Sequence, residues 1–288
     1  MKHLNLFIKL TRLNKPIGYM LLFWPCLWGL TLTYNFNNEI YTYLKYVIFF
    51  LLGSILMRSA GCIVNDITDK KFDKKVKRTK NRPIASGKIS TKLAVLYTLI
   101  LCFIALLVLL NFNLLTIVLA IASMPLAFTY PLMKRFTYWP QLFLGITFNY
   151  GLILAWTSIN DHISLIPILF YIGAIFWTLG YDTIYGYQDI KDDEIIGVKS
   201  TSIKFKNNPK KFLLLCYSVF IIMLTFVGSS MEFSNIFYLS LLVTFFHLFF
   251  YQIKMLNIKD PNNCLKLFKS NNTLGLIVFL NILLGKLI

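Results

Sequence analysis

The sequence has few charged residues and little of the chemistry that histidine and cysteine supply. Charged residues make up 14% of its 288 residues, against roughly 25% in ordinary soluble domains. Three histidines leave little for histidine-based metal or nucleophile chemistry, and five scattered cysteines form neither a disulfide framework nor a CxxC zinc pair. Hydrophobic residues make up 57%, which excludes a disordered basic tail protein. No segment is both basic and foldable alone, which excludes a soluble nucleic-acid-binding protein. These absences leave a membrane protein that crosses the bilayer several times.

Long apolar runs are abundant. A transmembrane helix needs about 20 mainly apolar residues, and the sequence predicts nine such spans in an all-α protein with a single domain over residues 1–288. We place them at residues 17–34, 44–64, 91–110, 113–130, 140–157, 163–187, 212–229, 235–252 and 273–287. The first run lacks a small-residue cleavage site after it, so we interpret it as a span and not as a signal peptide.

The basic residues predict how these spans are oriented. Of the 29 Lys and Arg, all but Lys45, Arg58 and Lys286 fall in alternate connections between spans. Basic connections mark the cytoplasmic side, so we expect the N-terminus inside and the C-terminus outside. No Arg- and Ser-rich presequence precedes the first span, which favours a bacterial cytoplasmic (inner) membrane over a mitochondrial one.

Only 12 residues are acidic, and eight of them form two clusters. The first cluster spans residues 65–73 at the cytoplasmic end of the second span, and the second spans residues 182–194 at the same end of the sixth. If each helix continues through its cluster, Asn65, Asp69 and Asp73 share one stripe. Asp182, Asp189 and Asp193 then lie within about 40° of one another. The sequence therefore predicts a column of oxygen ligands on each helix.

Converging carboxylates near a low-dielectric boundary repel one another, and a divalent cation relieves this cost. All-oxygen ligands favour Mg²⁺ or Mn²⁺ over zinc or copper. Magnesium commonly combines one or two carboxylates with water and phosphate oxygens. The alternative is that the acids are solvated and paired with neighbouring lysines.

Basic side chains follow each acidic cluster. Lys77, Arg78, Arg82 and Lys88 come after the first, and Lys199 comes after the second. Acids that bind a metal beside bases that bind oxyanions predict a magnesium–diphosphate site. Arg58 lies within the second span, about 10 Å deeper than Asn65 on the same face. An arginine inside the membrane suggests function, although a snorkelling or purely structural arginine is the alternative.

These motifs resemble the UbiA-type intramembrane aromatic prenyltransferases. The pattern N-D-x-x-D-x-x-x-D followed by V-x-R-T-x-x-R-P-x-x-S-G occupies residues 65–87, and D-x-x-Y-x-x-Q-D-x-x-D-D followed by G-V-K-S-T occupies residues 182–201. Residues 12–18, 57–62 and 130–135 are similar to the branch of the family that acts on 4-hydroxybenzoate in ubiquinone synthesis. Gly186 stands where the family usually has alanine, and the last three spans carry no motif.

The resemblance implies nine helices around a central cavity that opens to lipid, with the two motifs facing each other at its cytoplasmic mouth. It implies transfer of a polyprenyl group from polyprenyl diphosphate to the ring carbon ortho to the hydroxyl of 4-hydroxybenzoate, with Mg²⁺ as cofactor. By motif position, Mg²⁺ would be held by Asn65, Asp69, Asp73, Asp189 and Asp193. Asp66 and Asp182 would support that shell or orient substrate, and Arg78, Arg82 and Lys199 would bind diphosphate.

The expected reaction passes through an allylic cation that must be shielded from water. Aromatic faces can stabilise such a cation, and the candidates are Tyr185, Tyr187, Phe148 and Trp156. For Phe148 and Trp156 an ordinary place in the core is the alternative. The ring carboxylate of the acceptor needs a cation, for which the candidates are Arg58, Arg135 and Lys134. The base that removes the ring proton is not identified by the sequence.

Two other membrane functions, and other acceptors within the family, are the alternatives to this hypothesis. Membrane CDP-alcohol phosphotransferases also use aspartates at a helix end, but their D-G-x-x-A-R core is absent. A cation transporter needs a polar path across the membrane, and Thr178 alone interrupts the apolar outer part of the sixth span. Within the family, acceptors such as dihydroxynaphthoate or haem remain alternatives to 4-hydroxybenzoate.

Overall fold

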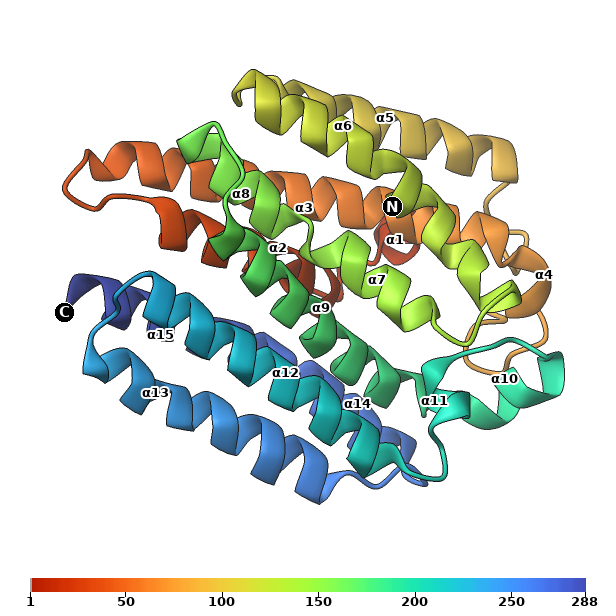
Figure 1. Cartoon of the computed structure of the whole chain (residues 1–288). Coiled ribbons are helices and arrows are strands. Elements are labelled where there is room, and N and C mark those ends of the chain that lie inside the picture. Colours follow the sequence, from red (N-terminus) through yellow and green to blue (C-terminus); the bar gives the residue numbers. More distant parts are fainter. Residues whose placement is uncertain (1) are drawn as a thin grey trace.

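The computed structural model describes residues 2–288 as a bundle of helices without strands (Figure 1). The side chain of Lys2, one of the basic residues assigned to the N-terminal cytoplasmic segment, lies outside this description. The elements are α1 Lys2–Thr11, α2 Ile17–Thr33, α3 Ile40–Thr68, α4 Lys70–Asp73, α5 Thr91–Leu109, α6 Leu114–Thr129, the 3₁₀-helix η1 Tyr130–Arg135, α7 Pro140–Asn149, α8 Gly151–Asn160, α9 Leu165–Gly186, α10 Ile190–Ile196, α11 Thr201–Lys204, α12 Pro209–Ser230, α13 Asn235–Phe245, the π-helix η2 Phe246–Ile253, α14 Pro261–Lys269 and α15 Asn271–Leu287.

The prediction of an all-α membrane protein is confirmed. In the described chain, eight helical segments are long and apolar enough to cross a bilayer, and α2 is a shorter apolar helix of 17 residues. The nine predicted runs match these nine segments, with two corrections. The last segment begins at Pro261 instead of residue 273, because α14 and α15 together form one span. The fifth is broken at Tyr150 into α7 and α8, where the Asn149 side chain donates to the Gly145 carbonyl and enters the helical ladder.

Helix α9 lies within the bundle and is packed on several sides. The ring of Trp28 of α2 is tilted against that of Trp177 of α9, with centroids 5.0 Å apart, and Phe220 of α12 stacks on Trp177. The two indole N–H groups reach the last helix: Trp28 donates to the Gly275 carbonyl at 2.9 Å and Trp177 to the Asn271 side chain at 2.8 Å. Buried indole groups with hydrogen-bond partners fix the relative positions of helices far apart in sequence.

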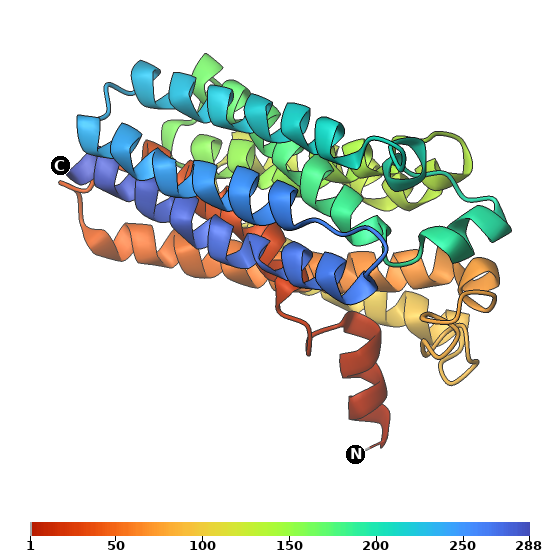
Figure 2. The same ribbon diagram turned by 90° about the horizontal axis from the view of Figure 1, so that it is seen from below.

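The outer faces of the bundle are apolar. On α5, for example, Leu99 is 62% and Phe103 is 60% exposed. An apolar surface of this extent is typical of contact with lipid. Helix α1 projects from the bundle at an angle to the other helices (Figure 2) and packs on α3 through Leu10, which is fully buried.

The basic connections between spans lie together at one end of the bundle. Helices α4, α10 and α11, which belong to the basic connections, lie together at this end, and the C-terminus lies at the other (Figure 1). The short connections at residues 34–39, 110–113, 161–164 and 231–234 lie between the remaining helix ends. The predicted alternation of connections is therefore present, and it places both acidic clusters at the same end.

Candidate active site

The first acidic cluster keeps its helical hydrogen bonds beyond the end of α3. The Asp69 amide donates to the Asn65 carbonyl at 2.9 Å, and the Asp73 amide donates to the Asp69 carbonyl at 2.8 Å. The chain thus passes from α3 into α4 with the spacing that the predicted stripe requires. Asp66, Asp69 and Asp73 are buried, with 2%, 2% and 6% of their surface exposed.

The second cluster does not lie on one continuous helix, and this expectation was wrong. Helix α9 ends at Gly186, and the next three amides donate to carbonyls only three residues back. Asp189 then precedes α10, which carries Asp193. The break has a tertiary cause: Ser202 of α11 packs on Gly186 and donates to the Thr183 carbonyl at 2.8 Å. A side chain at position 186 would meet Ser202, so the helix ends where α11 docks.

The structure nevertheless joins the two clusters, through Arg78. Its Nε donates to both carboxylate oxygens of Asp189, at 2.9 and 2.8 Å, and its Nη1 donates to the Tyr185 hydroxyl at 3.1 Å. Beside it, the Lys77 amide donates to Asp192 at 3.3 Å. A base of the first motif therefore holds an acid of the second, as expected if the two motifs serve one site.

The first cluster is also held by bases. Arg82 donates to Asp66 at 3.0 Å and to Asp73 at 2.8 Å, and Lys134 donates to Asp69. Arg12 donates to Asp66 at 2.6 Å. The sequence predicted only that Arg12 marks the cytoplasmic side, and it did not predict this contact with Asp66. A signal was available, because Arg12 opens the block 12–18 that resembles the family.

The burial and close spacing of the acidic side chains change their pKa values. Burial raises the pKa of the Asp69 carboxyl above its ordinary value, and Lys134 opposes the shift. Burial, and next the charge of Asp189, raise the pKa of Asp193 to about 6. Acids whose ionised form is disfavoured in this way gain from a nearby cation.

The donor set suits a hard divalent cation, because it consists of carboxylate and amide oxygens. One buried oxygen, Asp69 Oδ1, has no hydrogen-bond partner among the described residues. No three His, Cys, Asp or Glu side chains of residues 2–288 converge at metal-binding distance. Arg82, Lys134 and Arg78 each donate to a carboxylate of the two clusters. The donor types therefore fit Mg²⁺. A bound cation would compete with these three basic side chains for the carboxylates, and a bound anion would compete with the carboxylates for the basic side chains.

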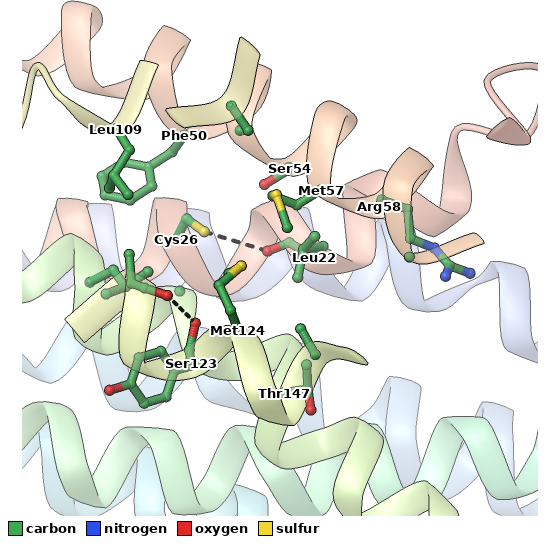
Figure 3. Close-up of a pocket in the computed structure, with 18 of the residues that line it drawn as sticks. Leu22, Cys26, Phe50, Ser54, Met57, Arg58, Leu109, Ser123, Met124 and Thr147 are labelled. Carbon is green, nitrogen blue, oxygen red and sulfur yellow. Dashed lines mark hydrogen bonds between the residues drawn. The ribbon is translucent and has the colours of Figure 1, made fainter. Parts of the chain in front are cut away.

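A cavity of about 410 Å³ lies within the bundle and extends from Arg58 toward the end opposite the clusters (Figure 3). Its wall is largely apolar and comes from α2, α3, α5, α6, α7 and α8, and Phe50 and Leu109 line it far from Arg58. Its size falls in the usual range for ligand sites, roughly 300 to 1,000 Å³. Arg58 lines one end of it (Figure 3), its guanidinium carbon lies 5.2 Å from the centre of the Phe148 ring, and its buried Nε has no hydrogen-bond partner among residues 2–288.

The other predicted residues lie in different surroundings. Tyr185 joins the site through Arg78, and Asp182 lies one turn earlier on α9. Lys199 donates to the Phe136 carbonyl at 3.2 Å, and its backbone joins Lys134.

Three side chains lie outside the site. Arg135 faces away from the acids: it donates to the Thr68 carbonyl at 2.7 Å and covers the Phe72 ring. Trp156 and Tyr187 belong to the main hydrophobic core and do not line the cavity, so the alternative of a core position holds for Trp156.

Comparison with known proteins identifies this architecture. The model of the UbiA prenyltransferase family matches residues 22–283. A mitochondrial 4-hydroxybenzoate polyprenyltransferase of Bos taurus is 43% identical over 98% of this chain and 75% of its own length. A 4-hydroxybenzoate octaprenyltransferase of Nitrosomonas eutropha is 40% identical over 98% of this chain and 97% of its own length.

Solved structures share the fold. A UbiA homologue from Aeropyrum pernix has a TM-score of 0.76 at 22% identity, covering 94% of this chain and 98% of its own. A UbiA homologue from Archaeoglobus fulgidus, solved with GPP and Mg²⁺ bound, has a TM-score of 0.69 at 16% identity, covering 96% and 99%. The family model and these relatives, together with the paired aspartate motifs at one end of a bundle that contains an apolar cavity, show that the chain belongs to the UbiA prenyltransferase family.

Proposed function

We propose that this chain transfers a polyprenyl group from polyprenyl diphosphate to the ring carbon ortho to the hydroxyl of 4-hydroxybenzoate and releases diphosphate, in ubiquinone biosynthesis. The observation that carries the proposal is the pair of acidic clusters that Arg78 bridges at one end of the bundle, together with an apolar cavity that Arg58 lines on the side of these clusters. Relatives of about 40% identity over nearly the whole chain are named for this reaction. We assign the cytoplasmic side of a bacterial inner membrane to the end that carries the clusters, because the basic connections lie there.

The diphosphate belongs at the clusters. We assign Arg78, Arg82 and Lys199 to its oxygens, and Asn65, Asp69, Asp73, Asp189 and Asp193 to hold Mg²⁺. When bound, the cation neutralises charge on the departing diphosphate. Arg78 and Arg82 now donate to carboxylates, and phosphate oxygens are equally good partners for their guanidinium groups. Asp66 and Asp182 are assigned to orient this set.

The prenyl chain belongs in the cavity, whose wall from Arg58 to Phe50 and Leu109 is mainly apolar. Such a wall keeps water from the allylic carbon. The Tyr185 ring lies beside the Arg78 guanidinium, with its centroid 5.6 Å from the guanidinium carbon, and so offers an aromatic face next to the proposed diphosphate site.

The carboxylate of 4-hydroxybenzoate needs a cation within reach of the cavity. Arg58 meets this need best among the three candidates, because it lines the cavity and its buried Nε has no hydrogen-bond partner among the described residues. Lys134 faces Asp69 and remains the second candidate. Arg135 donates to the Thr68 carbonyl, on the other side of the chain, and is the weakest of the three.

The test is product formation by the purified protein in detergent with Mg²⁺, geranyl diphosphate and 4-hydroxybenzoate. We expect geranylated 4-hydroxybenzoate and one equivalent of diphosphate. Parallel reactions with dihydroxynaphthoate and with haem examine the other acceptors of the family. Prenylation of either of these acceptors, with none of 4-hydroxybenzoate, would overturn the proposed substrate.

A further inference from the structure

A second pocket, of about 550 Å³, lies at the junction between α3 and α4, next to the start of α5. It shares no lining residue with the cavity that holds Arg58. It is lined by Ile67, Thr68, Lys70, Lys71, Phe72, Lys75, Thr91 and Arg135. We call it the outer basic pocket.

The charge of the outer basic pocket is not compensated. Four of its lining residues are cationic and none is acidic. Two of the cations contact neutral oxygens: Lys70 donates to the Thr91 hydroxyl at 3.3 Å, and Arg135 donates to the Thr68 carbonyl at 2.7 Å. Among residues 2–288, none of the four forms an ion pair with an acid. Clustered cations of this kind repel one another, and an anion among them removes that cost.

The pocket also lies at the edge of the lipid-facing surface. Helix α5 begins at Thr91, and one turn later Val95 and Leu96 are 43% and 51% exposed. Phe136, next to Arg135, is 71% exposed. The amino end of a 19-residue helix adds positive potential at Thr91. A cationic pocket at the head of an apolar outer surface suits a phosphate that is attached to acyl chains.

We propose that the outer basic pocket binds the phosphate of an anionic phospholipid headgroup. Lys71 and Lys75, both exposed at the pocket, contact the phosphate together with Lys70 and Arg135. The acyl chains run along the exposed apolar residues of α5. The same lysines could also take free inorganic phosphate, which shares this chemistry, so the experiment separates the two sources.

The experiment is native mass spectrometry of the full chain in detergent, titrated with dioleoylphosphatidylglycerol or with dioleoylphosphatidylcholine. The test variant is Lys71→Ala/Lys75→Ala. The matched control is Lys74→Ala/Lys80→Ala, which removes two exposed lysines of the same connection that do not line the pocket. We expect phosphatidylglycerol to bind more tightly than phosphatidylcholine. Removal of the two pocket lysines should weaken phosphatidylglycerol binding by roughly 10- to 30-fold, with less than a twofold effect in the control.

A second arm titrates inorganic phosphate against bound phosphatidylglycerol. Displacement by phosphate only at high millimolar concentration supports the lipid as ligand, whereas displacement at low millimolar concentration assigns the pocket to a soluble phosphate and overturns the lipid assignment. Equal loss of lipid in the pocket and control variants overturns the site itself. Thermal unfolding in detergent accompanies each variant, and the single variant Lys71→Glu serves if the double variant unfolds early.

Discussion

Arg78 Nε lies 2.8 and 2.9 Å from the two carboxylate oxygens of Asp189, and this contact ties the loop after α4 to the amino end of α10. The two residues belong to different motifs, 111 positions apart. If Arg78 binds diphosphate and Asp189 binds Mg²⁺, as we propose, each residue gives up part of this contact when the substrate and the cation bind.

The first prediction concerns Arg78. Arg78→Ala removes a forked donor from the proposed diphosphate site, and hydrogen bonds to charged groups contribute roughly 1.5 to 3 kcal/mol each. We expect kcat/KM for prenyl diphosphate to fall by about 10- to 100-fold. Arg78→Lys should recover only part of it, because lysine keeps the charge without the fork. Steady-state kinetics with varied prenyl diphosphate measure this, and Lys80→Ala, on the exposed side of the same loop, is the control. A kcat/KM within twofold of the wild type would contradict the assignment of Arg78.

The second prediction concerns Arg12, which follows α1 and donates to Asp66 at 2.6 Å. Asp66 is 2% exposed, so the loss of a partner leaves a buried carboxylate less compensated. We expect Arg12→Gln to lower the thermal unfolding temperature in detergent and to reduce turnover by about tenfold.

Arg12 has a positive φ of 58°, a conformation that glycine adopts without strain. Arg12→Gly therefore separates the two roles of this position. If the guanidinium matters, glycine is as damaging to turnover as glutamine, and if only the backbone matters, glycine is harmless. Lys9→Gln, an exposed change in the same helix, should leave both measurements unchanged.

The fold was largely predictable from the sequence, because apolar runs of the length of a bilayer can only be helices in lipid. The alternation of basic connections then placed both motifs at one end. The break after Gly186 was not predictable in this way. The stretch from Asp182 to Asp193 contains no proline, and the helix ends because α11 docks on Gly186, which is a tertiary contact.

The same difference between local pattern and tertiary contact applies to the residues of the site. The residue types of both motifs were predicted, since oxygen ligands and bases in clusters have few other uses in an apolar chain. The hydrogen-bond partners of these side chains were not predicted. Arg12 reaches Asp66 across 54 positions, and Arg135 donates to the Thr68 carbonyl. Such pairings depend on how helices pack, which the local pattern of a sequence does not specify.

The third prediction concerns Asp69, whose Oδ2 accepts from Lys134 while its buried Oδ1 has no hydrogen-bond partner in the described part of the chain. Asp69→Asn keeps the shape of the side chain but removes the charge that a divalent cation needs. We expect prenyl transfer to fall by at least about 100-fold, with an unfolding temperature close to that of the wild type. Glu232→Gln, at the other end of the bundle, is the matched control.

Metal removal is a separate test of the cofactor. After treatment with EDTA the wild type should lose prenyl transfer, and Mg²⁺ or Mn²⁺ should restore it while Ca²⁺ restores less, because Ca²⁺ prefers more ligands at longer distances. Full activity in the presence of excess EDTA would contradict the proposed role of the acids.

The last prediction concerns the cavity and the length of the prenyl chain. Gly53 of α3 lines the cavity, and a β-carbon placed there meets no atom within 4 Å. Gly53→Phe therefore fills cavity space without a clash at its first carbon. If the chain of the donor lies along this wall, the variant should reduce kcat/KM for a long prenyl diphosphate by about tenfold or more and for geranyl diphosphate by much less, because a short chain ends before the added ring. The adjacent residue Leu52 is 43% exposed and faces outward, so Leu52→Phe adds a similar ring on the same helix without entering the cavity. Kinetics with geranyl diphosphate and an octaprenyl diphosphate compare the two variants. An equal loss for both donors in Gly53→Phe, or the same selectivity in Leu52→Phe, would show that the prenyl chain leaves the protein by another route.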